Sequence, residues 1–253
     1  MPRLALAAVA LTACGRIGIE GIGNDGPAHD VGTDDGLVAR FLFANDVVAD
    51  TQTASSVNAF VGKCDQPTPQ GPQYSCPSGG DTTTGRPFAS GWDGQQDCIP
   101  FDYDARFDLP AAGSVAVWIR IQPPENFSLV SVIEKIYGTQ LENTWGIAID
   151  PSSMEVDFTT APQSSLRSTT ALSPDTWTHV AITWDSVTKH IYVAGVLAAS
   201  EDVGPLEHDG GAVTIGCDID HGSPTDYYGG LLSDLRIYNR ALSPADVALL
   251  AQP

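Results

Sequence analysis

The sequence predicts an all-β protein, a two-sheet antiparallel β-sandwich with one short helix at its C-terminal end. Three segments in the last third of the chain, 177–185, 190–199 and 229–242, alternate apolar with polar side chains. A period of two residues indicates a β-strand, because successive side chains point to opposite faces of a sheet. The stretch 37–253 also has a length that suits one large sandwich rather than two domains.

The first 13 residues resemble the signal peptide of a bacterial lipoprotein. Arg3 supplies a positive start, residues 4–11 form a short apolar run, and Cys14 follows where such proteins receive their lipid. The run is too short for a membrane-spanning helix, which needs about 20 apolar residues. We therefore expect a signal peptide over 1–13 and lipidation of Cys14, with a non-lipidated secretory signal as the alternative.

Residues 14–36 predict a flexible tether between the lipid and the domain at 37–253. They are rich in Gly and Asp and show no sustained hydrophobic period. The whole chain carries a net charge of −19. This charge argues against a nucleic-acid partner, since binding to phosphates requires a basic surface.

Two of the three strand segments also predict their own geometry. In 177–185, Val180, Ile182 and Trp184 point to one face, and the residues between them point to the other. In 190–199, the pair Ala194-Gly195 interrupts the strand where a tight reversal is needed, since Gly tolerates positive φ. The segment 190–199 is therefore predicted to be a hairpin.

In the third segment, Leu235 and Ile237 face one way, while Asp234, Arg236 and Tyr238 face the other. In this order, the three segments resemble the C-terminal half of the laminin-G-like, concanavalin A-like domains. Those domains have a Trp-x-His-Val-Ala strand, a Leu-Tyr-Val-Asp-Gly hairpin and a late Gly-x-Ile-Asp-x-Val-Arg-Ile-Tyr strand. The resemblance implies a jelly-roll sandwich. It implies less about function, because that fold hosts lectins, adhesion modules and hydrolases.

The same resemblance assigns the earlier segments. Residues 37–46 resemble the opening strand, 85–101 resemble a hairpin that turns at 92–94, and 114–120 resemble a strand with a buried Trp. The stretch of about 62–90 is longer than the corresponding connection in the family. We therefore expect an insertion there that forms a surface loop held by its cysteines, Cys64 and Cys76. Further strands are predicted at 128–136, 145–150, 154–160 and 211–216.

The chain is predicted to end in a short helix. Ser243 is a favourable N-cap, and Asp246 suits the positive end of the helix. Three apolar residues can pack back on the domain: Val247, Leu249 and Leu250.

The chain has five cysteines. Lipidation would remove Cys14 and leave an even number, as expected for disulfides in an oxidising compartment. A Cys64–Cys76 bridge would close a polar, Pro-rich loop, and Cys98–Cys217 would then cross-link two strands. The competing pairing joins Cys76 to Cys98. Zinc is disfavoured, since no Cys-x-x-Cys pair is present.

A hydrolase is the first function to test, because laminarinase-type glycoside hydrolases share the fold. Their strand carries Glu-x-Asp-x-(x)-Glu, and retaining chemistry needs two carboxylates ~5–5.5 Å apart. Here Glu155 and Asp157 share a face, but Thr159 and Thr160 stand where the acid/base should follow. We therefore expect a half-exposed strand with two surface acids, and no catalytic residue.

The resemblance implies a structural Ca²⁺ ion. Asp234 matches the late-strand Asp that helps to bind it in many concanavalin A-like domains, and Asp50 matches the other acidic position. Asn45 is a weaker third candidate. Because Ca²⁺ takes six to eight oxygen ligands, backbone carbonyls and water would complete the shell. The alternative is that Asp234 pairs with Arg236 or faces solvent.

Carbohydrate sites combine exposed aromatic faces with amide and carboxylate groups. Two clusters fit this description without singling out binding residues. One comprises Asp220, His221, Asp226, Tyr227 and Tyr228, and the other comprises Tyr137, Glu142, Asn143 and Trp145.

The expected function is therefore non-catalytic. We expect a lipid-anchored protein of the bacterial cell envelope that binds a polysaccharide or surface glycoconjugate, or mediates surface adhesion. Gly15 rather than Asp follows Cys14, which by resemblance to Gram-negative sorting favours the outer membrane. The alternative is a protein-interaction or scaffolding module without glycan affinity. A laminarinase-type hydrolase ranks below both.

Overall fold

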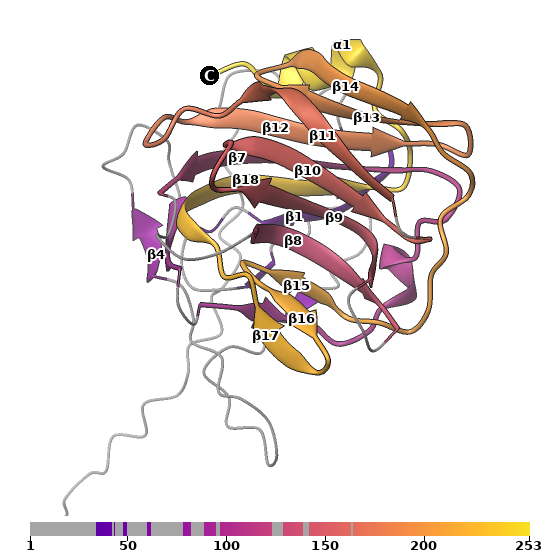
Figure 1. Ribbon diagram of the computed structural model, residues 1–253, viewed down its shortest axis with the longest axis horizontal. Helices are drawn as coiled ribbons and strands as arrows, with labels where there is room; N and C mark the ends of the chain where they lie inside the picture. Colours follow the sequence, from indigo (N-terminus) through magenta and orange to yellow (C-terminus); the bar gives the residue numbers. More distant parts are fainter. Residues whose placement is uncertain are drawn as a thin grey trace, which may run out of the picture.

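The protein is a sandwich of two antiparallel sheets, of eight and six strands, with a short helix after the last strand (Figure 1). This architecture confirms the fold that the sequence predicts. The computed structural model describes residues 34–41, 43, 48–49, 60–61, 78–81, 89–94, 97–122, 129–138, 142–162 and 164–253.

The eight-stranded sheet contains β1 (Leu37–Phe41), β4 (Ser78–Asp81), β5 (Ala89–Asp93), β7 (Gly113–Ile121), β12 (Thr178–Trp184), β13 (Thr188–Val193), β14 (Val196–Asp202) and β18 (Gly229–Tyr238). Their order is β14-β13-β12-β7-β18-β5-β4, and β1 also pairs with β18. One edge of β18 pairs first with β5 and then with β1, and its other edge pairs with β7. This strand therefore joins the first and last described parts of the chain.

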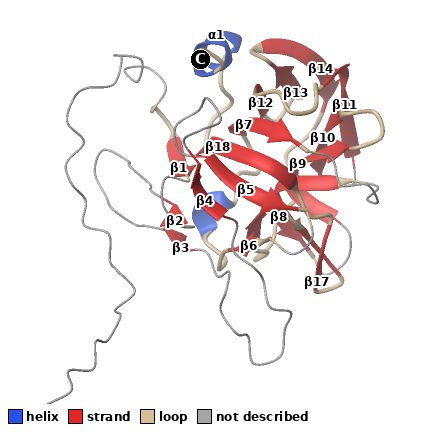
Figure 2. Ribbon diagram, turned by 90° about the vertical axis from the view of Figure 1, so that its left-hand side faces the viewer, coloured by secondary structure: helices blue, strands red, loops and turns tan. Residues whose placement is uncertain are grey.

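The six-stranded sheet contains β6 (Ile99–Pro100), β8 (Val130–Tyr137), β9 (Glu142–Asp150), β10 (Glu155–Thr160), β11 (Ser164–Ala171) and β15 (Val213–Ile215), in the order β11-β10-β9-β8-β15-β6. Two short pairs accompany it: β2 (Val48–Ala49) with β3 (Phe60–Val61), and β16 (Asp218–Asp220) with β17 (Ser223–Thr225). In the turned view of Figure 2, β8 to β11 lie to the right of β1, β18 and β7.

The main core fills the space between the sheets. Trp145 of β9 and Trp184 of β12 stack there with ring centroids 5.8 Å apart, and Phe158 of β10 adds a third ring. Both indole N–H groups are satisfied, because they donate to the carbonyls of Phe107 and Leu109. The loop around the 3-10 helix at Ala105–Phe107 thus covers this end of the core and supplies the backbone carbonyls that the two buried indole N–H groups need.

A smaller apolar cluster covers the outer face of the eight-stranded sheet. The helix α1 (Pro244–Leu250) packs there through Val247, which is fully buried, and Leu250. Ser243 and Asp246 form a capping box at its start, as predicted for the N-cap. The prediction for Leu249 is wrong. Its side chain is 38% exposed, because it lies on the solvent side of the helix.

The strand predictions for the last third are confirmed. Val180, Ile182 and Trp184 lie in the main core, and Ala181 faces the outer cluster. The β13–β14 hairpin turns at Ala194-Gly195, and both residues have positive φ. Residues in the left-handed region at both turn positions give the type of reversal that matches the twist of a hairpin.

The predicted hairpin over 85–101 is wrong. The strand β5 ends at Asp93 and Gly94 takes positive φ, as a turn requires, but β6 then joins the other sheet and pairs with β15. The reason is that β4 and β18 already occupy the two edges of β5. The strand β4 itself lies inside the predicted insertion at 62–90.

The structure pairs Cys98 with Cys217, which lie 119 residues apart in the sequence. Of the two pairings that involve Cys98, it therefore adopts the one that cross-links strands. The signal peptide, the predicted lipidation residue Cys14, and Cys64 and Cys76 lie outside the described residues. Within the described part of the chain, no helix has the length and apolar character needed to cross a bilayer.

Candidate functional site

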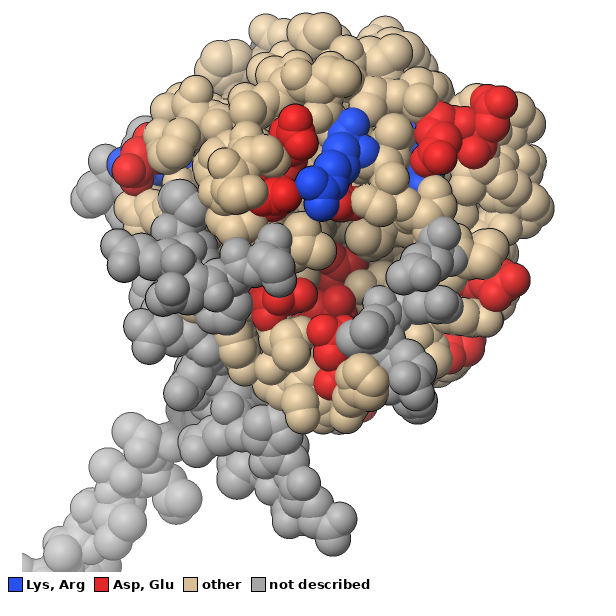
Figure 3. All heavy atoms as spheres, in the orientation of Figure 1, with Lys and Arg blue, Asp and Glu red and all other residues tan. Residues whose placement is uncertain are grey.

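A pocket of about 350 Å³ opens on the outer face of the six-stranded sheet. Figure 3 shows acidic side chains gathered in this hollow, with basic side chains above it. Its lining comes from β8 to β11 and from the β16–β17 hairpin. The lining residues are Leu129, Ser131, Glu134, Asn143, Ala148, Asp157, Thr159, Thr160, Ser164, Ser165, Arg167, Asp218, Asp220 and Asp226.

One wall is built around Asp157. Because Val156 and Phe158 face the core, alternation turns Asp157 to the outer face. Its carboxylate accepts hydrogen bonds from Ser165 Oγ and from Arg167 Nε, the latter at 3.1 Å. The expectation that Asp157 is a surface acid is wrong, since it is only 2% exposed. The side chains of β11 cover it.

The floor of the pocket is Glu134, which is 1% exposed. Its carboxyl group lies over Gly146 of the neighbouring strand, where a Cβ atom would fall 1.3 Å from Oε2. Thr159 Oγ1 donates to the same oxygen at 3.4 Å. The glycine on β9 therefore makes the room that Glu134 occupies.

The opposite wall is the β16–β17 hairpin, which turns at His221-Gly222, both with positive φ. This reversal brings Asp218, Asp220 and Asp226 together. One carboxylate oxygen of each lies within 4.8 Å of the other two. These three acids, called the Asp triad below, could hold a metal ion.

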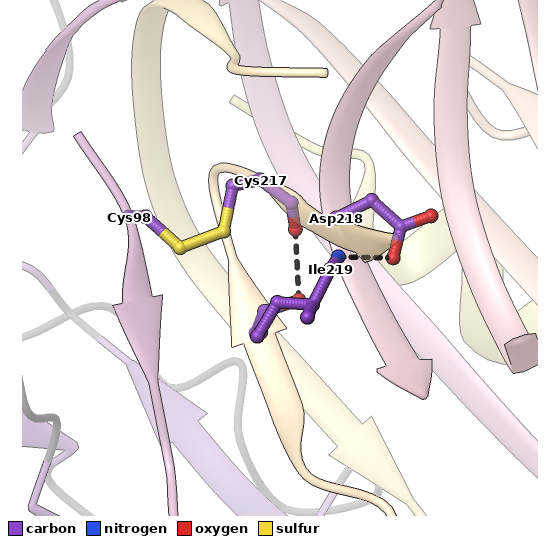
Figure 4. Close-up of a disulfide and its surroundings, with 5 residues drawn as sticks. Cys98, Cys217, Asp218 and Ile219 are labelled. Atoms are coloured by element: carbon purple, nitrogen blue, oxygen red, sulfur yellow. Dashed lines mark hydrogen bonds between the residues drawn. A yellow bond between two sulfur atoms is a disulfide. The ribbon is translucent and has the colours of Figure 1, made fainter. Parts of the chain in front are cut away.

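Two attachments hold this hairpin against the sheet. At one end, the Cys98–Cys217 disulfide immediately precedes Asp218, and the carbonyl of Cys217 accepts from Thr214 Oγ1 at 2.7 Å (Figure 4). At the other end, the backbone N–H of Ser131 donates to the carbonyl of Asp226 at 2.7 Å. The Asp triad is therefore attached to the sandwich on both sides.

Hydrogen bonds orient two of the three acids. Asp218 accepts from Asn143 Nδ2 at 2.9 Å and from the backbone N–H of Ile219 at 2.6 Å. Asp220 accepts from Thr225 Oγ1 at 2.9 Å. Among the described residues, none donates a hydrogen bond to the carboxylate of Asp226. That group therefore has both oxygens available to a ligand.

Burial controls the protonation of the pocket. It raises the pKa of Asp218 to about 6, and burial together with the charges of Asp218 and Asp220 raises the pKa of Asp226 to about 6. Burial also raises the pKa of Glu134 well above its ordinary value, and the charges of Asp218 and Asp157 add to this. Burial therefore favours the protonated form of Glu134, while Asp218 and Asp226 lose their protons near pH 6.

A buried lysine supports the rim. Lys189 reaches from β13 between the sheets and donates to Thr160 Oγ1 and Ser164 Oγ, two hydroxyl groups that line the pocket. Its ammonium lies 3.4 Å from Glu201 and 5.3 Å from the centroid of the Phe158 ring. Burial lowers its pKa. The lysine fixes the position of both hydroxyls without entering the pocket lining.

The predicted calcium residues are placed as follows. Asp234 lies on β18 and takes positive φ at a bulge in the strand. Its carboxylate pairs with Arg236 at 2.9 Å and with Arg40 at 2.7 Å. Burial alone would raise the pKa of Asp234, but the hydrogen bonds and charges of the two arginines lower it to about 2. Asp50 and Asn45 lie outside the described residues, so the calcium site stays a prediction.

The two predicted glycan clusters meet only in part. Asp220 and Asp226 of one cluster and Asn143 of the other line the same pocket. The aromatic members do not, because Trp145 and Tyr228 are fully buried in the core. The hydroxyl of Tyr137 donates to Glu207. The two clusters thus include three residues that line the pocket, whereas their aromatic members are not part of its lining.

Glu134 and Asp218 were missed. Glu134 stands in the segment SVIEKIY, where bulges in the β8–β9 pairing change which residues face outward. Asp218 follows a cysteine, and a short DID segment with a Gly-containing turn was the available signal for the hairpin.

Comparison with known proteins finds one matching family and several solved structures with a similar fold. The concanavalin A-like lectin/glucanases superfamily matches residues 93–248. No curated protein matches the chain.

Domain 4 of AbnA, a GH43 extracellular arabinanase from Geobacillus stearothermophilus solved with arabinotriose, has a TM-score of 0.59 at 20% identity. The match covers 85% of this chain and 98% of that one. The binding domain of botulinum neurotoxin serotype C1 has a TM-score of 0.62 at 15% identity. The binding domain of Paraclostridial Mosquitocidal Protein 1 has a TM-score of 0.63 at 12% identity. In both cases 87% of this chain matches 52% of the other, so the chain spans about half their length.

Proposed function

This chain belongs to the concanavalin A-like lectin/glucanases superfamily, and from that premise we propose that it binds carbohydrate without cleaving it. The observation that carries the proposal is the pocket on the six-stranded sheet, because most of the residues that line it have polar side chains. Carboxylate, amide, hydroxyl and guanidinium groups converge there from five separate elements. Such a mixture of hydrogen-bond donors and acceptors suits the hydroxyl groups of a sugar.

The size and lining favour a short ligand. A volume of about 350 Å³ lies near the lower end of the range for small-molecule sites. Among the described residues that line the pocket, none is aromatic, and only Leu129 and Ala148 are apolar. Recognition therefore relies on hydrogen bonds to one or two sugar units rather than on stacking along a chain. A terminal or branching unit of a polysaccharide fits these limits.

Binding without catalysis is supported by the strand β10. Thr159 and Thr160 follow Asp157, so this strand does not carry the spaced carboxylates of laminarinase-type hydrolases. Asp157 is also engaged by Arg167 and Ser165. Several matched structures are themselves described as binding domains, and one was solved with an oligosaccharide.

We further propose that the domain acts at the bacterial cell envelope. The support is the N-terminal sequence, in which Cys14 follows a short apolar run, and the Gly- and Asp-rich tether that comes next. Lipid on Cys14 would hold the pocket near the membrane, with the outer membrane favoured by Gly15. Incorporation of labelled palmitate that is lost in Cys14→Ser tests this assignment.

A glycan array probed with the mature protein tests the main proposal. We expect retention of a restricted set of glycans, and loss of that signal in Asp157→Asn and Arg167→Gln. The matched control is Asp202→Asn, an exposed carboxylate on β14 outside the pocket lining. An array without signal, combined with a defined protein partner, would instead establish the interaction-module alternative.

A further inference from the structure

The pocket contains many acidic side chains and few basic ones. Among the described residues that line it, five carry carboxyl groups and Arg167 is the one basic residue. That arginine is engaged by Asp157 and Asp150. Within the described part of the chain, no Lys, Arg or His forms an ion pair with Glu134 or with any member of the Asp triad. As far as the described residues go, the acids of the wall opposite Arg167 therefore have no ion-pair partner.

This charge lies inside a cavity rather than on an open surface. Asp218 is only 7% exposed, and Asp220 and Asp226 are half-buried. Low-dielectric walls concentrate the field of charged groups in a cleft, so the wall attracts a cationic group strongly. The cavity is much larger than a metal ion and continues to Asp157, Ser165 and Arg167. The ligand that fills it must therefore have a neutral polar part as well as a charge.

The spacing of the Asp triad leaves room for a primary ammonium group. Each residue offers an oxygen within 4.8 Å of the other two. Three acceptors at about 2.8 Å around a tetrahedral nitrogen lie about 4.6 Å apart, so a primary ammonium can donate one hydrogen bond to each. An ammonium needs only these three acceptors. Calcium needs six to eight oxygens, and the oxygens of Asp218 already accept hydrogen bonds from Asn143 and Ile219.

We propose that the pocket selects a sugar unit that carries a free amino group. Its ammonium lies among Asp218, Asp220 and Asp226, and its hydroxyl groups reach Asp157, Ser165 and Arg167 on the opposite wall. This inference rests on the proposed carbohydrate binding and adds the ligand class. N-acetylation of the amine removes both the charge and two N–H donors, so the acetylated sugar is excluded.

Calorimetric titration of the mature protein at pH 7, in about 150 mM salt with chelator, tests this. The probes are the glucosamine trimer, the N-acetylglucosamine trimer, arabinotriose and spermine. We expect the glucosamine trimer to bind at least about tenfold more tightly than its acetylated form, since the acetyl group removes charged hydrogen bonds that each contribute about a factor of ten or more. Asp226→Asn and Asp220→Asn should each reduce that preference about tenfold. Asp202→Asn should retain it.

Each other outcome is decisive. Equal binding of spermine would show that charge alone is read and would overturn the sugar assignment. Tighter binding of arabinotriose or of the acetylated trimer would overturn the proposed selection of a free amino group, while the proposed carbohydrate binding would stand. Binding of a neutral sugar that appears only when Ca²⁺ replaces the chelator would assign the triad to a metal. Silence of all three sugars, here and on the array, would remove the proposed function itself.

Discussion

Arg167 lies directly opposite Asp157 across the β10–β11 pair, and its guanidinium spans two acids, with Nε 3.1 Å from Asp157 Oδ2 and Nη1 2.9 Å from Asp150 Oδ2. The two ends of this interaction differ in exposure. The side chain of Arg167 is 48% exposed, whereas that of Asp157 is 3% exposed. The arginine therefore shields a buried carboxylate from the solvent side and forms part of the pocket wall.

Arg167→Gln should destabilise the protein by about 1–2 kcal/mol, because it leaves the carboxylate of Asp157 buried without a cation. Arg167→Lys should destabilise the protein less than Arg167→Gln, because lysine keeps the charge but a single ammonium cannot span both acids. Urea denaturation measures the change. In the double variant Arg167→Gln/Asp157→Asn most of the loss should disappear, and purely additive losses would show that the pair is not coupled.

Gly146→Ala should destabilise the fold by about 1–3 kcal/mol and abolish ligand binding, because the new Cβ would occupy the position of the Glu134 carboxyl group. Gly204→Ala is the matched control, since no atom lies within 4 Å of its Cβ position. Adding Glu134→Ala to Gly146→Ala removes the clash. If the double variant is no more stable than Gly146→Ala, then Glu134 does not occupy this space in solution.

Stability should fall as the pH rises from about 4 to above 6. Asp218 and Asp226 have pKa values of about 6 in the folded protein against an ordinary value of 3.8, and burial raises the pKa of Glu134 as well. The folded state thus binds more protons than the unfolded chain in this window, and the stability these groups contribute at low pH is lost as they ionise.

The other charged groups of the pocket, Asp157, Asp220 and Arg167, face the same cavity. We expect a change on the order of 2 kcal/mol, or several degrees in Tm, between pH 4.5 and 7.5. Melting curves of wild type, Asp226→Asn and Glu134→Gln provide the measurement, and the variants should show a shallower slope. A wild-type Tm that rises over this range with the same slope in both variants would contradict the assignment.

Loss of the Cys98–Cys217 disulfide should cost about 2–4 kcal/mol, because the bridge joins residues 119 positions apart and restricts the unfolded chain. The double variant Cys98→Ala/Cys217→Ala tests this by denaturation under non-reducing conditions. Sugar affinity should fall as well, since the bridge adjoins Asp218. An unchanged midpoint with unchanged affinity would show that the hairpin is held by its hydrogen bonds alone.

The calcium prediction is best tested at Asp50, because Asp234 is already engaged by Arg40 and Arg236 and its substitution would also break those pairs. If the predicted site exists, added Ca²⁺ raises the Tm of chelator-treated protein, and Asp50→Asn removes that effect. Removal by Asp226→Asn instead would place the ion in the Asp triad. No response in wild type would reject calcium at both places.

Local patterns predicted most of the sandwich. Alternation placed Val180, Ile182 and Trp184 in the core, and the Ala194-Gly195 pair gave the hairpin turn, because each depends on neighbouring residues only. The destination of β6 depends instead on which strand edges are already occupied. A local sequence pattern carries no information about which strand edges are already paired. The strand–turn–strand pattern over 85–101 therefore predicts a hairpin that the structure does not form.

The pocket was harder to predict for a related reason. The strand β11 reads SSLRSTTA, an edge strand without apolar alternation, and it was not predicted. Without β11, Asp157 has no Arg167 above it and looks like a surface acid. The Asp triad likewise needs the hairpin to fold over β8, which depends on a cysteine pairing left open by the sequence. The site is therefore formed by contacts between segments that lie far apart in the sequence, which local patterns do not predict.

The described chain begins and ends on the same side of the sandwich. Leu37 pairs with Tyr238, the N–H of Asn239 donates to the carbonyl of Gly36, and α1 covers the outer face of the eight-stranded sheet (Figure 2). The pocket lies on the outer face of the other sheet. A single surface loop of an unrelated host could therefore accept residues 34–253 as an inserted module, with the pocket directed away from the junction.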